Sequence, residues 1–246
     1  MFVFKAAVVG AGTMGGQIAQ SIAAAGFPVV LKDIRQDLVD HGLTEARNVT
    51  QGQVAKMVSK GKLTEEQGAA QVEEIVGRIE GTTSYEGFGD VDFVIEAVPE
   101  VMAIKQAVFA ELDAVTPGHA ILASNTSSLS VTEIAVATKK PSRVLGMHFF
   151  NPATVMQFVE VIRTVVTSDD VFSDVKALAE RLDKKPVVVG DKAGFIANAL
   201  LFGYLNHAVS MYEQKYATRE DLDAAMRFGC GLPMGPLALM DLIGLD

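Results

Sequence analysis

Short apolar runs, each followed by a longer stretch of mixed polarity, recur along the first part of the chain. Residues 5–10, KAAVVG, form one such run and end on a glycine, as buried parallel strands commonly do. Apolar residues then recur at helical spacing from Ile18 to Ala23, Gly26 ends that helix, and VVLKDI (29–34) forms a second run. This order predicts a strand, a helix and a second, parallel strand.

Four later runs predict further strands of the same sheet. They are DVDFVIEAVPE (90–100), AILAS (120–124), RVLGMHFFN (143–151) and FVEVIRTVVTS (158–168). The turn NPAT separates the last two runs, which predicts neighbouring strands joined by a tight reversal. We therefore expect an α/β fold with a Rossmann-type, doubly wound, mostly parallel sheet. Ligands of such sheets bind outside the carboxyl ends of the strands.

A helical hairpin is expected to interrupt this sheet at about residues 36–80. The segment predicts two helices around SKGKLT. Thr64, followed by Glu66 and Gln67, predicts a capping box at the start of the second helix.

The pattern divides the chain into two domains. We place the sheet domain at residues 1–191 and a smaller, all-helical domain at 192–246. Residues 194–216 and 218–229 have the apolar spacing of two helices that would begin the second domain. A length of 246 residues suits one domain of about this size with a smaller appendage.

Charge and cysteine content narrow the function classes. The net charge is −9, so no overall field draws the protein to nucleic acid or to an anionic membrane. The one cysteine, Cys230, argues against a disulfide framework or a zinc–cysteine cluster, and we expect it to be a small buried residue. The start, MFVFKAAVVG, lacks the layout of a signal peptide, and the longest apolar stretch (193–209) is short for a bilayer. We expect a cytoplasmic protein without a metal site.

The sequence GAGTMG (10–15) joins the first strand to the following helix. Here Gly10 permits the tight turn, Gly12 lets the backbone approach a pyrophosphate, and Gly15 lets helix and strand pack closely. The N–H groups at the helix start would bind the diphosphate. Asp33, at the end of the second strand, would accept hydrogen bonds from the adenosine ribose and repel a 2′-phosphate. The alternative is a turn without a ligand. The arrangement predicts NAD rather than NADP, although two basic residues beside Asp33 reduce the preference.

The sequence HFFNPATVMQFVE (148–160) carries a histidine and a glutamate across an apolar stretch. One interpretation is a satisfied core histidine, and the other is a general base with the carboxylate that tunes it. If the two predicted strands pair, His148 and Glu160 can meet side by side.

The polar turn SNTSS (124–128) follows the strand at 120–124. Asn125 and Ser127 could cap the next helix or line a ligand site. Ser128 and Ser130 suit the cap better.

Five motifs in matching order and spacing resemble the L-3-hydroxyacyl-CoA dehydrogenase family. They are GAGTMG, SNTSSLS, GMHFFNP with the following VEVI, GFIANALL, and GLPMGPLALMDLIGLD. The resemblance covers essentially the whole chain and reaches bacterial 3-hydroxybutyryl-CoA dehydrogenases and the dehydrogenase part of fatty-acid oxidation proteins. It implies an enzyme that reversibly oxidises an L-3-hydroxyacyl-CoA to the 3-ketoacyl-CoA with NAD.

The resemblance also implies roles for particular residues. His148 would be the general base, and Glu160 would orient it and balance its charge. Ser127 would contact the substrate oxygen, and Asn198 the substrate carbonyl region. The implied NAD contacts are Gly10, Gly12, Thr13, Met14, Gly15, Asp33, Glu100, Lys105 and Asn125.

These residue types also suit the oxidation of an alcohol, independently of the resemblance. Oxidation of a secondary alcohol removes a hydride from carbon and a proton from oxygen. A neutral imidazole can take the proton, and a carboxylate on its other nitrogen fixes the tautomer.

The chain departs from the family pattern in three places. The family commonly has proline and arginine where this chain has Ala193 and Ala199, and it continues for several helical turns beyond the final IGLD. We therefore expect a homodimer once the helical domain is complete. Two other functions stay open: a 3-hydroxyacid dehydrogenase, which would need a helical lysine where this chain has Asn198, and a crystallin-like NAD-binding protein with little acyl-CoA activity.

Lys56 and Lys60 lie in a locally basic part of the helical insertion, and we expect them to meet the phosphates of coenzyme A. The substitutions Lys56→Ala and Lys60→Ala should each weaken binding of acetoacetyl-CoA by roughly two- to fivefold, the effect of one exposed charge contact. Calorimetric titration measures this affinity. Unchanged affinity in both variants would remove the idea.

Overall fold

The computed structural model describes residues 4–244, and their contacts divide the chain into two compact units. The first unit ends at Ala193 and the second begins at Gly194. Residues 1–3 and 245–246, which the predicted domains include, lie outside the described range.

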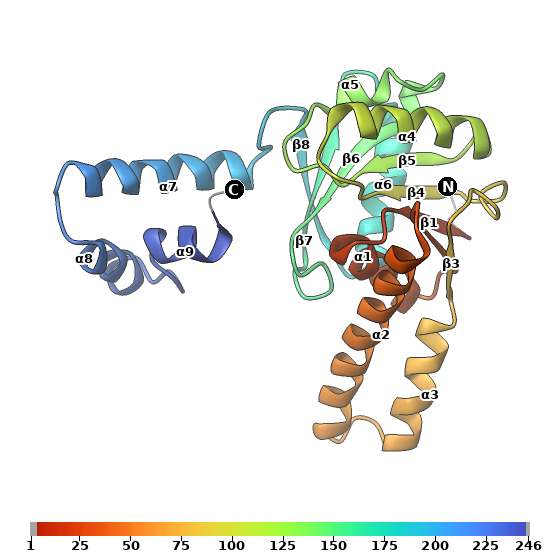
Figure 1. The fold of residues 1–246 in the computed structure, drawn as a ribbon, viewed down its shortest axis with the longest axis horizontal. Helices are drawn as coiled ribbons and strands as arrows, with labels where there is room; N and C mark the ends of the chain where they lie inside the picture. The colour runs from red at the N-terminus through yellow and green to blue at the C-terminus, as the bar shows by residue number, and fades with distance from the viewer. Residues whose placement is uncertain (1–3, 245–246) are drawn as a thin grey trace. The chain divides into compact units, whose positions relative to one another are not determined.

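The first unit alternates strands and helices, as the apolar runs predict. In chain order it contains β1 (Ala6–Val9), α1 (Thr13–Ala24), β2 (Val29–Lys32), α2 (Gln36–Ser59), α3 (Glu65–Val76), β3 (Ile79–Thr82), β4 (Phe93–Glu96), α4 (Met102–Val115), β5 (Ile121–Ser124), α5 (Val131–Ala135), the 3-10 turn η1 (Pro141–Arg143), β6 (Val144–Phe149), β7 (Phe158–Arg163), α6 (Asp169–Arg181) and β8 (Lys185–Gly190) (Figure 1).

Within residues 4–244, eight strands form one sheet in the order β3-β2-β1-β4-β5-β6-β7-β8. Every neighbouring pair is parallel except β6 and β7, which are antiparallel. The order runs outward in both directions from β1 and β4, so the predicted doubly wound, mostly parallel sheet is confirmed.

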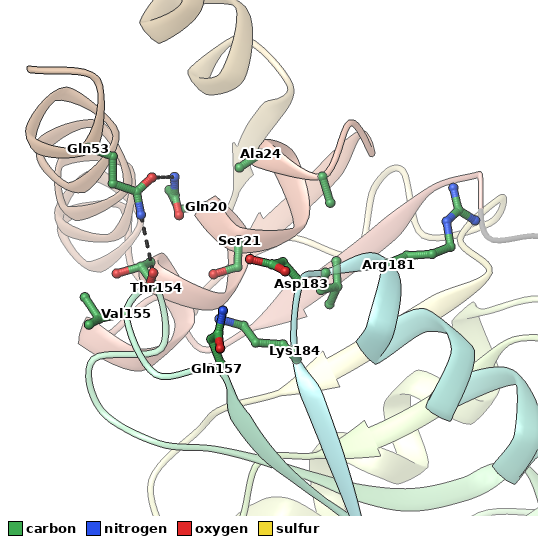
Figure 2. Close-up of a pocket in the computed structure, with 12 residues that line it drawn as sticks. Gln20, Ser21, Ala24, Gln53, Thr154, Val155, Gln157, Arg181, Asp183 and Lys184 are labelled. Carbon is green, nitrogen blue, oxygen red and sulfur yellow. Dashed lines mark hydrogen bonds between the residues drawn. The ribbon is translucent and has the colours of Figure 1, made fainter. Parts of the chain in front are cut away.

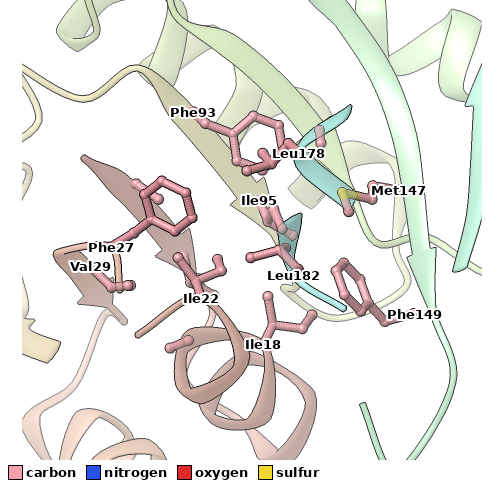
Figure 3. Close-up of a cluster of buried hydrophobic side chains, with 14 of the residues drawn as sticks. Ile18, Ile22, Phe27, Val29, Phe93, Ile95, Met147, Phe149, Leu178 and Leu182 are labelled. Carbon is pink, nitrogen blue, oxygen red and sulfur yellow. The ribbon is translucent and has the colours of Figure 1, made fainter. Parts of the chain in front are cut away.

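Alternation along the strands distributes their side chains between two cores. In β1, Ala6 and Val8 face the cluster that includes α1 and α6, whereas Ala7 and Val9 face the cluster beside α4 and α5. Figure 3 shows the first cluster, where Ile18 and Ile22 of α1 lie against the sheet. Both faces of the sheet are thus covered, which explains why its strands are continuous apolar runs.

The insertion forms the predicted hairpin, and α2 and α3 project from the sheet side by side (Figure 1). The capping box is confirmed, because Thr64 Oγ1 accepts from the Gln67 N–H while Gln67 Oε1 accepts from the Thr64 N–H. Gly68 lets the two helices approach, since a Cβ there would lie 2.9 Å from a methyl group of Val54.

Several predicted element bounds are wrong, and two strands were not predicted. The strand at 158–168 ends at Arg163, because Thr164 and Thr167 fold the chain into a turn through their hydroxyl groups. The tight turn NPAT is a longer connection, residues 150–157. The first of the two unpredicted strands, β3, has Glu80 and Gly81 in its middle and so lacks an apolar run. The second, the edge strand β8, has the apolar run Val187–Val189 but is largely exposed.

The second unit is helical. It contains α7 (Ala197–Glu213), α8 (Arg219–Ala224), the π-helical turn η2 (Ala225–Gly229) and α9 (Pro236–Ile243). The helix predicted at 218–229 therefore changes to π geometry for its last turn. The expectation of a buried cysteine is wrong, since Cys230 is exposed after that turn.

The crowded Gly15 of α1 and the uncrowded Gly52 of α2 together test how closely α1 packs. A Cβ on Gly15 would lie 1.7 Å from the carbonyl oxygen of Gly10, so Gly15→Ala should lower the free energy of unfolding by roughly 3 kcal/mol. A Cβ on Gly52, within α2, would meet nothing within 4 Å, so Gly52→Ala should raise it by about 0.5–1 kcal/mol. Urea denaturation of both variants measures the difference. Equal stability of the two variants would contradict the close packing at Gly15.

Candidate active site

A cavity of about 560 Å³ lies at the carboxyl ends of β1, β2 and β4. It is lined by Val9, Gly10, Gly12, Thr13, Met14, Lys32, Asp33, Ile34, Leu38, Ala97, Val98, Pro99, Ile104 and Val108. Five of the predicted cofactor residues are therefore brought together here: Gly10, Gly12, Thr13, Met14 and Asp33. The remaining lining is mostly apolar, which suits the flat face of an adenine ring.

The glycine loop has the geometry that a diphosphate requires. Gly10 has a φ of 100°, and a Cβ there would lie 2.5 Å from the carbonyl oxygen of Ala97. Gly12 starts α1, and a Cβ there would meet nothing within 4 Å. No side-chain hydrogen bond caps this helix start, so the first N–H groups of α1, at the positive end of the helix dipole, are available to a diphosphate. The residues present therefore fit a dinucleotide.

Asp33 is tied to this loop by one of its oxygens and to the next residue by the other. Oδ2 accepts from the N–H of Ala11 at 2.7 Å, and Oδ1 from the N–H of Ile34 at 2.7 Å. Each carboxylate oxygen keeps a further lone pair, so Asp33 can still accept from the ribose hydroxyls.

The two cations beside Asp33 have other partners. The ammonium of Lys32 lies 4.2 Å from the centre of the Tyr85 ring, and the guanidinium of Arg35 pairs with Asp37 at 2.8 Å. The positive charge that reduces the predicted preference for NAD is thus directed toward an aromatic ring and a carboxylate.

His148 and Glu160 occupy directly opposed positions on β6 and β7. His148 Nδ1 lies 2.8 Å from Glu160 Oε2, and His148 Nε2 lies 3.1 Å from Ser127 Oγ. Both members of the pair are buried. Because a carboxylate can only accept, Nδ1 carries the hydrogen and Nε2 presents a lone pair toward Ser127. The observed chain Ser127–His148–Glu160 is that of a hydroxyl, a base and an orienting carboxylate.

Asn125 joins the loop of Ser127 to the strand of His148. Its side-chain oxygen accepts from the N–H of Phe149 at 2.8 Å. The ring of Phe150 lies against the imidazole of His148, with ring centres 4.5 Å apart. Of the two roles left open for Asn125, capping the next helix is excluded, because Ser130 is the residue that caps α5.

Glu100 holds the same loop from the end of β4. Its Oε1 accepts from the hydroxyl of Thr126 at 2.5 Å and from the N–H groups of Ser127 and Ser128 at 2.9 and 3.1 Å. Burial opposes ionisation of this carboxyl, but the Thr126 hydrogen bond and the charge of Lys105 outweigh it, and the pKa of Glu100 lies below its ordinary value. Ser128, suggested as a cap, belongs to this contact instead.

Lys105 is 1% exposed and forms a buried ion pair with Glu96, which is fully buried. The ammonium lies 2.7 Å from Glu96 Oε1, 3.2 Å from the carbonyl of Val98 and 3.3 Å from Glu100 Oε2. Glu96 also accepts from the hydroxyl of Ser124 at 2.7 Å. All three ammonium protons thus have an acceptor within the protein, and a direct contact of Lys105 with the cofactor stays a prediction.

Sequence reasoning missed the polar side chains that hold the connection between β6 and β7. Lys184 donates to the carbonyl oxygens of Ala153 and Met156, and Gln17 accepts from the N–H of Ala153. Gln53 of α2 donates to the carbonyl of Thr154, as Figure 2 shows. Burial lowers the pKa of Lys184. No pattern along the chain marks these residues, because their partners are backbone groups far away in sequence.

The other predicted site residues lie elsewhere. Lys56 and Lys60 are exposed at the end of α2. Asn198 is on α7 of the second unit, and its part in the site stays a prediction. Among residues 4–244, no cluster of three or more histidine, cysteine or acidic side chains could hold a metal ion. In the same range, every helix is too short or too polar to cross a membrane.

Comparison with known proteins gives consistent matches over the chain. Residues 5–192 match the family model for the NAD binding domain of 3-hydroxyacyl-CoA dehydrogenase, and residues 194–246 match its C-terminal domain. A 3-hydroxybutyryl-CoA dehydrogenase of Clostridioides difficile is 45% identical over 98% of this chain and 83% of its own length.

Two further relatives extend these matches. The crystal structure of (S)-3-hydroxybutyryl-CoA dehydrogenase from Ralstonia eutropha superposes with a TM-score of 0.92 at 39% identity, covering 100% of this chain and 84% of that one. A fatty acid oxidation complex subunit alpha of Psychrobacter is 42% identical over 98% of this chain, which spans only 32% of that protein.

Removing one partner of the buried Lys105–Glu96 pair should destabilise the protein. Lys105→Met leaves the buried Glu96 without its cation, so the free energy of unfolding should fall by about 3 kcal/mol or more. Adding Glu96→Gln should restore part of that loss. As a control, Lys5→Met removes an ion pair with the exposed Asp90 and should cost about 1 kcal/mol or less. Urea denaturation compares the variants, and equal costs for the two lysines would contradict this account of the pair.

Proposed function

The chain belongs to the 3-hydroxyacyl-CoA dehydrogenase family, whose members are NAD-dependent oxidoreductases, and from this premise we propose that it reversibly oxidises L-3-hydroxyacyl-CoA to 3-ketoacyl-CoA. The observation that carries the proposal is the chain of contacts from Ser127 through His148 to the buried Glu160. NAD, when bound, supplies the hydride acceptor. The residues of this chain supply the proton transfer and the positioning.

We propose His148 as the general base. The lone pair on Nε2 would receive the proton of the substrate hydroxyl during oxidation and return it during reduction. Ser127 Oγ, 3.1 Å from Nε2, marks the place at which a substrate hydroxyl can approach this nitrogen. Ser127 would then hold the substrate oxygen in line with the base, where small displacements are costly.

Glu160 would act through His148. Its contact with Nδ1 keeps the hydrogen on that nitrogen, so the lone pair that receives the proton is on Nε2. When the imidazole becomes positively charged, the buried carboxylate opposite it would stabilise that charge.

We propose the remaining roles from the family resemblance, together with what the structure shows around each residue. Gly10, Gly12, Thr13, Met14, Gly15 and Asp33 are proposed to hold NAD, and the cavity that they form or border supports this. Glu100, Lys105 and Asn125 are proposed to border the cofactor while holding the Ser127 loop. Asn198 is proposed to contact the substrate carbonyl region. The exposed Lys56 and Lys60 are proposed to meet the phosphates of coenzyme A.

Neither rival function gains support from a specific residue. A 3-hydroxyacid dehydrogenase would need a catalytic lysine in the helix that here is α7, and α7 contains none. A crystallin-like binding protein would not need a buried acid–base pair, and this chain retains one.

We also propose that the protein works as a homodimer in the cytoplasm. The second unit exposes large apolar side chains, including Leu200 at 72% and Phe228 at 79%, and burial of such surface favours association. One exposed cysteine thiol in 246 residues suits a reducing compartment. The substrate partner would be an acyl-CoA, and the net charge of −9 disfavours nucleic acid and anionic membranes as partners.

The first test is consumption of NADH on addition of acetoacetyl-CoA, comparing the unaltered chain with Glu160→Gln. The variant should lose about 100-fold or more in kcat, because the amide neither fixes the tautomer nor balances the imidazolium charge. NADH binding, followed by fluorescence, should be unchanged.

The exposed Glu180 on α6 provides a matched control, and Glu180→Gln should keep full activity. Turnover that survives Glu160→Gln would contradict the mechanism. An unaltered chain that binds NADH but never turns over would contradict the proposed reaction.

A further inference from the structure

The loop that carries Ser127 is held at both ends by carboxylates. Glu100 binds its first half, as described above. Its second half is held by Asp191, which follows β8. Asp191 accepts from the hydroxyl of Ser130 at 3.0 Å and from the N–H groups of Val131 and Thr132 at 3.0 and 2.7 Å. One side chain from 60 residues away thus fixes the start of α5.

We propose that Asp191 is a positioning residue for the reaction, acting through Ser127 by holding the end of its loop. This rests on the proposed function, in which Ser127 places the substrate oxygen beside His148. Ser127 lies three residues before Ser130, so the direction in which α5 starts determines where the loop can place the Ser127 hydroxyl.

Asp191 binds N–H groups of α5 that the cap by Ser130 does not reach. Ser130 already caps this helix, because its Oγ accepts from the N–H of Glu133 at 3.3 Å. The same hydroxyl donates its hydrogen to Asp191, which also takes the first two N–H groups of the helix. Burial opposes ionisation, but the bonds from Thr132, Val131 and Ser130 outweigh it, and the pKa of Asp191 lies below its ordinary value. The carboxylate is therefore ionised at neutral pH, and its hydrogen bonds are of the stronger, charge-assisted kind.

Asp191 directly follows β8, which ends at Gly190. Its contacts therefore join the edge strand of the sheet to the start of α5.

Asp191 gives a cleaner test than Glu100. Glu100 also contacts Lys105 and is proposed to border NAD. Its substitution would therefore alter the Lys105 contact and the proposed NAD site together with the Ser127 loop. Asp191 is absent from the lining of the cofactor cavity.

The test is a double-mutant cycle between Asp191→Asn and Ser127→Ala, measured as kcat for reduction of acetoacetyl-CoA at saturating NADH. Asp191→Asn alone should lower kcat about tenfold, because the reacting groups are misplaced, and should leave the KM for NADH unchanged. In the Ser127→Ala background the same substitution should change kcat by less than about twofold, since the residue through which it acts is gone.

Asp223 provides the matched control. It accepts from two successive N–H groups at the start of α9, Leu237 at 2.8 Å and Ala238 at 3.0 Å, so Asp223→Asn removes the same kind of contact in the second unit. Asp223→Asn should change kcat by the same factor in the unaltered chain and in the Ser127→Ala background. The proposal is overturned if Asp191→Asn lowers kcat by the same factor with and without Ser127→Ala. It is also overturned if Asp191→Asn leaves kcat unchanged.

A second measurement does not depend on catalysis. Hydrogen exchange of the amides from Ser127 to Thr132 should become faster in Asp191→Asn, while exchange of the glycine-loop amides stays the same. Ser130→Ala removes one of the three contacts and should give a smaller change in the same direction if Asp191→Asn folds poorly. Unchanged exchange in both variants would overturn the proposal even in an active enzyme. Faster exchange in a chain that never turns over would instead refute the proposed function.

Discussion

The hydrogen bond between His148 and Glu160 is the contact on which the proposed chemistry depends. It exists because β6 and β7 are the one antiparallel pair in the described sheet and their register sets these two residues opposite each other. Cross-strand neighbours in such a pair lie close enough for side chains to bond directly. A shift of one residue in register would turn Glu160 to the other face of the sheet and leave the base without its carboxylate.

Much of the surrounding structure keeps that pair and Ser127 in place. The connection between the two strands is bound by Gln17, Gln53 and Lys184, which come from α1, α2 and the start of β8. Because α1 also begins at the glycine loop, Gln17 links the cavity beside that loop to the connection between β6 and β7. Each of these bonds satisfies a backbone group of an irregular segment, and such groups are costly to leave unpaired when buried.

Carboxylates set the position of the Ser127 loop. Glu96 binds its first residue, Ser124, Glu100 binds the loop backbone, and Asp191 binds its end. Lys105 supplies the positive charge that balances Glu96 in the interior. A loop without regular structure is thereby fixed on a rigid sheet, which is what a group that must align a substrate oxygen requires.

The sequence by itself determined most of the sheet, the glycine loop and the residues proposed as the acid–base pair. These features depend on local patterns: apolar runs, glycines at fixed spacing around a strand and a helix, and family motifs that name His148, Glu160 and Ser127. Only the tertiary structure decided that Lys105 is enclosed by Glu96 and Glu100, that Lys184 holds the β6–β7 connection, and that Asp191 anchors α5. Each of these side chains bonds to groups that other elements bring to it. A single charged residue in a sequence carries no sign of which distant backbone it will meet, because that depends on the packing of the whole sheet.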